Sequence, residues 1–281
     1  MTLRVRNRFI LYSALAVLFT ALVLTGVMMY EMWFHGGMTG LLDMLPALHS
    51  AETLYGLRVP GSATSRNFIP LSVLIPVPIA VGAALLTRRY FRSSITPTIF
   101  FVTMSMILSG LSGIRILQVL LPVYDFPSTY AATVSRTVYA LHIAGALSLF
   151  TASMYAAGAQ YTRIWGALIA VGTTAMAFAY VLPVDAFQLD QMLLHRVASR
   201  GNAQLITGVL ALLTLVNFLR YAVEAEESGR AFVPLALCAI LVSREILFYV
   251  SGLPLHLLAA GMNVTGFALF ARNSYAVYLW S

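Results

Sequence analysis

The chain has 281 residues, of which 60% are hydrophobic and 10% are charged, and its mean hydropathy is +0.85. Soluble domains carry roughly 25% charged residues, so this composition excludes a soluble enzyme and predicts an all-α, polytopic transmembrane helical bundle. The net charge of +7 comes from 17 basic residues, all of them arginine; their scatter argues against nucleic-acid binding, and the lack of lysine excludes a retinal Schiff base.

The apolar runs predict about eight membrane-spanning helices in a single integral-membrane bundle. The first run is too long for the core of a signal peptide, so we assign it as a span. The last run is short and contains two glycines, so it spans, lies at the interface or packs on the bundle, and seven spans is the alternative. The predicted spans cover approximately residues 9–30, 69–87, 96–121, 137–158, 165–182, 203–219, 231–250 and 253–270.

The arginines are divided unevenly between the two sides of these spans. Ten lie on the side of the N-terminus, five lie on the opposite side, and Arg115 and Arg244 fall within spans. Positive residues favour cytoplasmic segments. We therefore expect a cytoplasmic N-terminus, with the connections 31–67 and 185–202 outside.

The seventh predicted span carries adjacent charges, Arg244 and Glu245, followed by Tyr249. An ionised side chain at the bilayer centre costs at least about 3 kcal/mol, and such residues usually mark functional sites. Arg115 in the third span and His142 in the fourth are expected at a similar depth, in the outer half of the membrane. These five residues predict a buried polar nest, which serves either a functional site or only an interhelical ion-pair cluster that locks the bundle.

A quinone head group would suit the functional alternative. It needs hydrogen-bond partners for its two oxygens and a base that accepts protons as the quinol is oxidised. Histidine and carboxylate side chains suit that role because their pKa values can be tuned towards neutrality. We therefore expect Glu245 and His142 to accept protons, and Arg115, Arg244 and Tyr249 to bind the head group.

Haem b is a second, less favoured cofactor. Two axial histidines would have to face each other at similar depth, yet only His142 lies clearly within a predicted span. His35, His49 and His195 fall in connections, and His256 falls at the start of the last helix. For His49 and His256 we expect ordinary solvated or interfacial side chains.

A metal site at Asp185, Asp190 and His195 is a third and weaker alternative, because the spacing offers no helical i, i+4 ligand pair on the histidine side. The same run could instead form an outward amphipathic helix. Its apolar side would then consist of Phe187, Met192 and Leu193.

Two stretches resemble the membrane-anchor subunit of DMSO reductase-type molybdoenzymes, within the wider polysulfide-reductase anchor superfamily. RILQVLLPVYDFPSTYAATVSRTVYALHIAGAL, from Arg115, is similar to the family's arginine-containing span with its Pro-aromatic loop and small-residue helix. VPLALCAILVSREILFYVSG, from Val233, resembles the family's glutamate, arginine and phenylalanine-tyrosine signature, although here Arg244 precedes Glu245. The two stretches come in the family's order.

The resemblance implies a membrane anchor, in the cytoplasmic (inner) membrane, for an iron–sulfur subunit and a molybdopterin catalytic subunit. Such an anchor oxidises menaquinol near the outer face and passes the electrons to the iron–sulfur partner. His35 would correspond to the family's outer histidine and act as a further proton acceptor. An iron–sulfur cluster needs about four thiolates. This chain has only Cys238, so any such cluster must lie in the partner subunit.

Two rival functions remain at this point. A receptor or sensor bundle would bind a small apolar ligand in the outward pocket and would need a separate transducer. A transporter is less favoured, because the sequence shows neither an inverted-repeat pattern nor paired broken helices.

Overall fold

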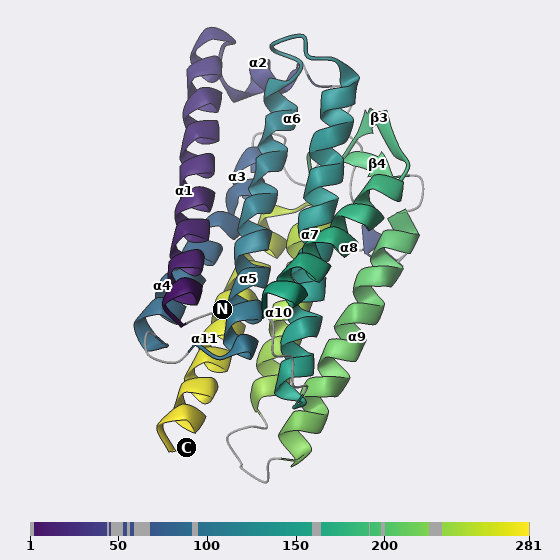
Figure 1. Cartoon of the computed structure of the whole chain (residues 1–281). Helices are drawn as coiled ribbons and strands as arrows, with labels where there is room; N and C mark the ends of the chain where they lie inside the picture. The colour runs from purple at the N-terminus through teal and green to yellow at the C-terminus, as the bar shows by residue number, and fades with distance from the viewer. Residues whose placement is uncertain are drawn as a thin grey trace.

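The computed structural model describes residues 3–43, 45, 53–54, 57–58, 68–91, 95–158, 164–190, 192–197, 200–224 and 232–280. Within these residues, eight helical segments are long and apolar enough to cross a membrane. This finding confirms the predicted all-α polytopic bundle. The start of the first helix and the end of the last lie at the same end of the molecule (Figure 1), as an even number of crossings requires.

The first half of the chain supplies four spans, two of which are interrupted. The connection after the first helix contains a short helix and a two-stranded antiparallel hairpin. The elements are α1 (Leu3–Phe34), α2 (Met38–Asp43), β1 (Thr53–Leu54), β2 (Leu57–Arg58), α3 (Ile69–Leu74), α4 (Pro76–Tyr90), α5 (Pro97–Leu111), the 3₁₀ segment η2 (Ser112–Ile116), α6 (Leu117–Leu120) and α7 (Ser128–Ala156).

The second half adds four uninterrupted helices and a second antiparallel hairpin. We call the end of the bundle that carries this hairpin the hairpin end, and the opposite end, where α1 begins and α11 finishes, the termini end (Figure 1). The elements are α8 (Ile164–Val181), β3 (Val184–Leu189), β4 (His195–Val197), α9 (Arg200–Glu224), α10 (Phe232–Tyr249) and α11 (Leu253–Trp280).

Several helices run further than the apolar runs predict. Helix α1 continues to Phe34, which places Glu31 inside the helix instead of in the following connection. Helix α11 has 28 residues and includes a span over Leu253–Tyr275, so the last apolar run crosses the membrane like the others. Hydropathy underestimates such helices because polar side chains at a helix end can reach the interface or a buried partner.

The second and third spans are broken at neighbouring positions. Pro76 has no N–H to donate, and α3 ends two residues before it, at Leu74. In the third span the helix tightens to 3₁₀ geometry over Ser112–Ile116. A Cβ on Gly113 would lie 3.3 Å from a methyl group of Val77, so the glycine allows the two irregular stretches to approach closely.

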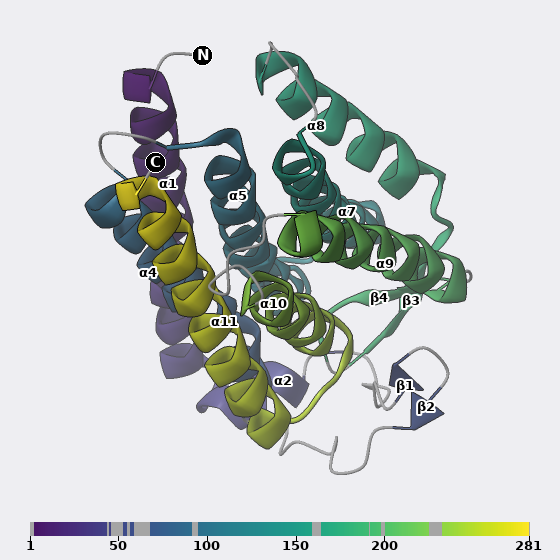
Figure 2. The ribbon, with the colours of Figure 1, turned by 90° about the horizontal axis from the view of Figure 1, so that it is seen from below.

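Helix α10 lies in the middle of the bundle, beside α9 and α11 (Figure 2). Most of its side chains are buried, as are those of α5 and α7. Helices α8 and α9 instead expose large apolar side chains such as Ile169, Leu205 and Leu212. This pattern is expected of helices that face lipid, since lipid and the protein interior are similarly apolar.

The connection between α8 and α9 is a hairpin, and the amphipathic helix predicted there is wrong. Strands β3 and β4 pair antiparallel, with Val184 opposite Val197 and an irregular register before Leu189. The turn between them is closed by the Asp190 carboxylate, which accepts the backbone N–H groups of Met192 at 2.9 Å and Leu194 at 3.1 Å. Such aspartate-closed turns compete with helix.

Candidate functional site

The end of α10 brings the predicted polar nest together. Arg244 lies against α7, where its Nη2 is 3.2 Å from Nδ1 of His142 and also donates to the His142 backbone carbonyl. Gly145, one turn further along α7, leaves room for this contact: a Cβ there would lie 3.3 Å from the guanidinium carbon. The side chains of Arg244 and His142 are almost fully buried, so the guanidinium packs closely against α7.

Glu245, the next residue on α10, approaches the same imidazole from its other nitrogen. Its Oε1 lies 3.2 Å from Nε2 of His142, and its Oε2 accepts the Thr207 hydroxyl of α9 at 3.2 Å. A guanidinium can only donate, so Nδ1 of His142 carries the lone pair and Nε2 carries the proton. The two groups are therefore close enough to exchange a proton, although the 3.2 Å contact is not aligned as a hydrogen bond.

The imidazole of His142 is also held by rings. It stacks on Phe248 with the ring centroids 3.7 Å apart and the planes 12° from parallel. Tyr249 meets it edge-on at 5.3 Å. These contacts fix the direction in which the ring nitrogens point.

Arg115 makes backbone contacts that the sequence did not predict. From the 3₁₀ segment, its guanidinium donates to the backbone carbonyls of Leu247 at 3.1 Å and Phe248 at 3.4 Å. Arg200 likewise donates to the Tyr249 carbonyl at 2.9 Å. The last carbonyls of a helix have no intrahelical partner and form its negative end. The two arginines therefore cap α10 and hold its last turn in place.

A small cavity adjoins the nest, with a volume of about 10 Å³, roughly the size of one water molecule. Its wall includes the imidazole and guanidinium of the nest but neither Arg115 nor Tyr249. The residues that line it are Pro76, Ser109, Ser112, His142, Arg244, Leu247 and Phe248.

A much larger apolar groove, of about 520 Å³, lies between α1 and α4. Leu74 and Val77 line this groove, and Pro76, which lies between them in the chain, lines the small cavity. The broken second span thus separates an apolar groove from the polar nest. The groove is lined by Leu18, Ala21, Leu22, Thr25, Leu74, Val77, Pro78, Val81, Gly82 and Leu85.

His35 does not join the nest. Its Nε2 lies 3.3 Å from Oε2 of Glu31, one turn earlier on α1, and the other oxygen of Glu31 accepts the Tyr124 hydroxyl. This hydrogen bond raises the pKa of Tyr124. Glu31 is buried, whereas the His35 side chain is 29% exposed. The structure therefore contains a second titratable cluster at the hairpin end, which the sequence pattern did not reveal.

The hairpin covers the nest with a further polar layer. Ser135 of α7 accepts the backbone N–H of His195 at 3.0 Å and the Gln118 amide at 3.0 Å, so it joins three elements.

Burial raises the pKa of the Asp190 carboxyl, an effect opposed chiefly by Arg200, whose Nη1 lies 3.9 Å away. Burial also lowers the pKa of His195.

The structure does not support the metal site or the expected exposure of His256. Asp185, Asp190 and His195 do not form a metal site: in the part of the chain that the structure describes, no three His, Cys, Asp or Glu residues gather closely enough to hold a metal ion. His256, expected to be solvated or interfacial, is fully buried, and its Nδ1 lies 2.9 Å from the Gly252 carbonyl. His49 lies outside the described residues.

Sequence reasoning missed Thr207, which donates to Glu245 of the nest, because threonine is common in membrane helices. It also missed Ser243 and Asn263, whose side chains join α10 to α11 by a hydrogen bond of 3.0 Å. The chain is thus a multi-pass membrane protein with a buried Arg–His–Glu cluster near one end. Comparison with models of known protein families and with curated proteins gives no match for it.

Proposed function

We propose that this chain is a quinol-binding membrane subunit of a multisubunit respiratory oxidoreductase. The observation that carries the proposal is the buried His142–Glu245 pair, 3.2 Å apart, with Arg244 on the other ring nitrogen and a small cavity beside it. Membrane-embedded charge of this kind is costly and usually functional. If the substrate is lipid-soluble and releases protons, the buried carboxylate can accept them.

Oxidation of a quinol releases two electrons and two protons. In the proposal, Glu245 accepts the two protons one after the other from the quinol hydroxyls, and Arg244 polarises each oxygen that loses its proton. The protons then leave towards the hairpin end, where the buried Glu31 and the partly exposed His35 serve as acceptors. The electrons pass to an iron–sulfur partner, since this chain has one cysteine only.

The resemblance noted in the sequence suggests menaquinol as the quinol, with a molybdopterin subunit reducing the terminal substrate. It also suggests the cytoplasmic membrane, with the hairpin end outward. The distribution of arginine agrees with this orientation, because the termini end carries more of them.

The geometry of His142 favours a quinol over haem b. An axial ligand must offer a free ring nitrogen to the iron, but Nδ1 faces Arg244 and Nε2 faces Glu245. A receptor site for an apolar ligand would not require the buried carboxylate. The quinol proposal therefore uses more of the observed groups than its rivals.

The α1–α4 groove offers the quinol tail a place to bind. The small cavity holds about one water, so the head group would enter by displacing the broken second span near Pro76, between groove and nest. Breaks of this kind in a membrane helix are tolerated where the freed backbone groups find other partners. We propose that the tail lies in the groove while the head group reaches His142.

Filling the groove tests this proposal. A Cβ on Gly82 meets nothing within 4 Å, so Gly82→Leu would place a side chain in the groove without distorting the helix. Displacing two methylene groups of the tail, at about 0.8 kcal/mol each, would raise KM for a long-tailed quinol roughly tenfold. KM for a short-tailed analogue should stay unchanged in the assembled complex.

Gly172→Leu is the matched control. Gly172 is exposed on α8 and its Cβ would likewise meet open space, so both KM values should stay unchanged. Equal KM values for Gly82→Leu and wild type would overturn the tail site alone. Absence of quinol-dependent turnover in the wild-type complex would overturn the proposed function.

A further inference from the structure

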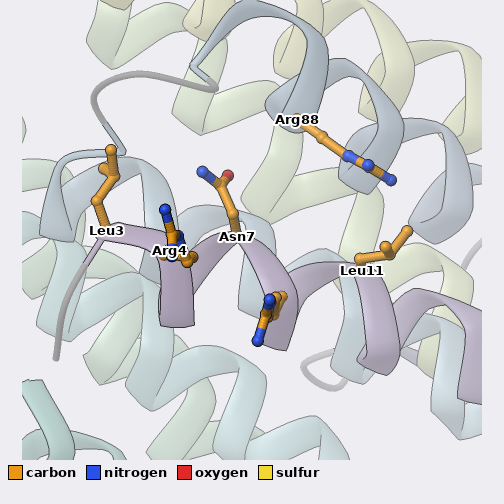
Figure 3. A pocket seen from close by; sticks show the side chains of 6 residues that line it. Leu3, Arg4, Asn7, Leu11 and Arg88 are labelled. Atoms are coloured by element: carbon orange, nitrogen blue, oxygen red, sulfur yellow. The ribbon is translucent and has the colours of Figure 1, made fainter.

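At the termini end, three arginines surround a third hollow, of about 380 Å³, between the start of α1 and the end of α4. Figure 3 shows Arg4, Asn7 and Leu11 rising from α1 towards this hollow, with Arg88 above them on the neighbouring helix. Leu3 and Arg8 complete its lining. The quinol proposal makes no use of this hollow.

The charge of the hollow is all of one sign. Among the described residues, its lining has three guanidinium groups and no carboxylate, and no ion pair joins Arg4, Arg8 or Arg88 to an acidic side chain. At the same end of the bundle, Arg220 is neutralised by Glu224, with 2.6 Å between Nε and Oε1. Three like charges around one hollow repel each other unless an anion lies between them.

The surroundings point to a lipid as the source of that anion. Leu3 and Leu11 form the apolar part of the lining, and α1 continues from there with exposed Tyr12 and Leu15, 63% and 50% accessible. Acyl chains would lie along this surface. The start of a membrane helix lies at the depth of the lipid phosphates, where its free N–H groups also favour negative charge.

From this geometry we infer that the hollow binds the head group of an anionic phospholipid. The phosphate is held by Arg4, Arg8 and Arg88. The acyl chains lie along the apolar face of α1 that continues towards Leu15. Guanidinium groups suit this role because their planar forks bind phosphate bidentately. The site ties α1 to α4 at the end opposite the nest.

The test is a titration of the purified full-length protein in detergent with short-chain phosphatidylglycerol, followed by native mass spectrometry. Phosphatidylcholine with the same chains controls for the head group, and inorganic phosphate controls for a free anion. Phosphatidylglycerol should bind at least tenfold more tightly than phosphatidylcholine. Equal binding of the two lipids, or displacement of phosphatidylglycerol by millimolar inorganic phosphate, would overturn the assignment.

Arginines near a membrane also set topology, so the variants must keep their charge. Arg4→Lys with Arg88→Lys retains both positive charges but loses the bidentate forks, and should weaken phosphatidylglycerol binding about tenfold. Arg220→Lys, at the same end but paired with Glu224, is the matched control and should bind the lipid like wild type. Unchanged affinity in the double variant would contradict the site.

Discussion

Replacing Glu245 by glutamine should lower the kcat for quinol oxidation by at least about 100-fold, because general acid–base groups contribute roughly 10²- to 10⁴-fold. Glutamine has the same shape: its carbonyl oxygen can still face His142, 3.2 Å away, and its amide nitrogen can donate to the Thr207 hydroxyl, which now accepts. It cannot take up a proton. The loss should therefore appear in turnover, measured with reduced menaquinone in membranes that contain the assembled complex.

Two variants separate this effect from a change in structure. Glu224→Gln makes the same substitution in an exposed ion pair with Arg220 and should leave turnover unchanged. Thr207→Val removes one hydrogen bond from the carboxylate but leaves the carboxylate itself, so we expect a loss of only a few-fold. Wild-type kcat in the Glu245→Gln complex would show that this carboxylate does not accept the quinol proton.

Replacing Arg115 by alanine should lower the free energy of unfolding by about 3 kcal/mol or more, since hydrogen bonds from a charged group contribute roughly 1.5–3 kcal/mol each. Arg115 is fully buried and donates to the carbonyls of Leu247 and Phe248. The alanine variant leaves these two acceptors without a donor and opens a cavity. Unfolding of the purified protein in detergent, by heat or denaturant, measures the difference.

Arg220→Ala is the control for this prediction, because Arg220 is exposed and its removal should leave stability unchanged. Arg115→Lys should recover only part of the loss, since one ammonium cannot reproduce the two-pronged contact. If Arg115→Ala unfolds like wild type, the cap on α10 contributes nothing measurable and Arg115 must be kept for another reason.

The composition predicted the fold well, because lipid leaves few alternatives to a helical bundle. The positions of His142, Arg244, Glu245 and Tyr249 within the predicted spans also indicated that these side chains would lie together. Each lies in a span at a similar depth, and buried charge must find partners. That reasoning needs only the order of the spans and the depth of each residue in the membrane, and both can be read from the positions of the apolar runs.

The roles of individual side chains were harder to predict. Arg115 caps α10 because the 3₁₀ segment meets the last turn of that helix, a contact between residues more than 130 positions apart. Glu31 and Tyr124 are likewise distant in the chain. No local pattern encodes such contacts.

The hairpin between α8 and α9 shows a different limit. The spacing of its apolar residues fits a helix, but Met192 and Leu193 are both fully buried among neighbouring elements, and Asp190 closes a turn. Leu193 also has a positive φ of 55°, which a helix does not allow. Tertiary burial decided the conformation here, as it commonly does in short segments.

The central claim is that a quinol binds beside the His142–Glu245 pair. Labelling the purified complex with a photoreactive menaquinone analogue, and mapping the modified peptides by mass spectrometry, tests it most directly. We expect labels near Ser109, Ser112 and His142, the residues that line the small cavity, and loss of label when unmodified menaquinone competes. Labels confined to the lipid-facing surfaces of α8 and α9, or unaffected by competitor, would contradict the claim.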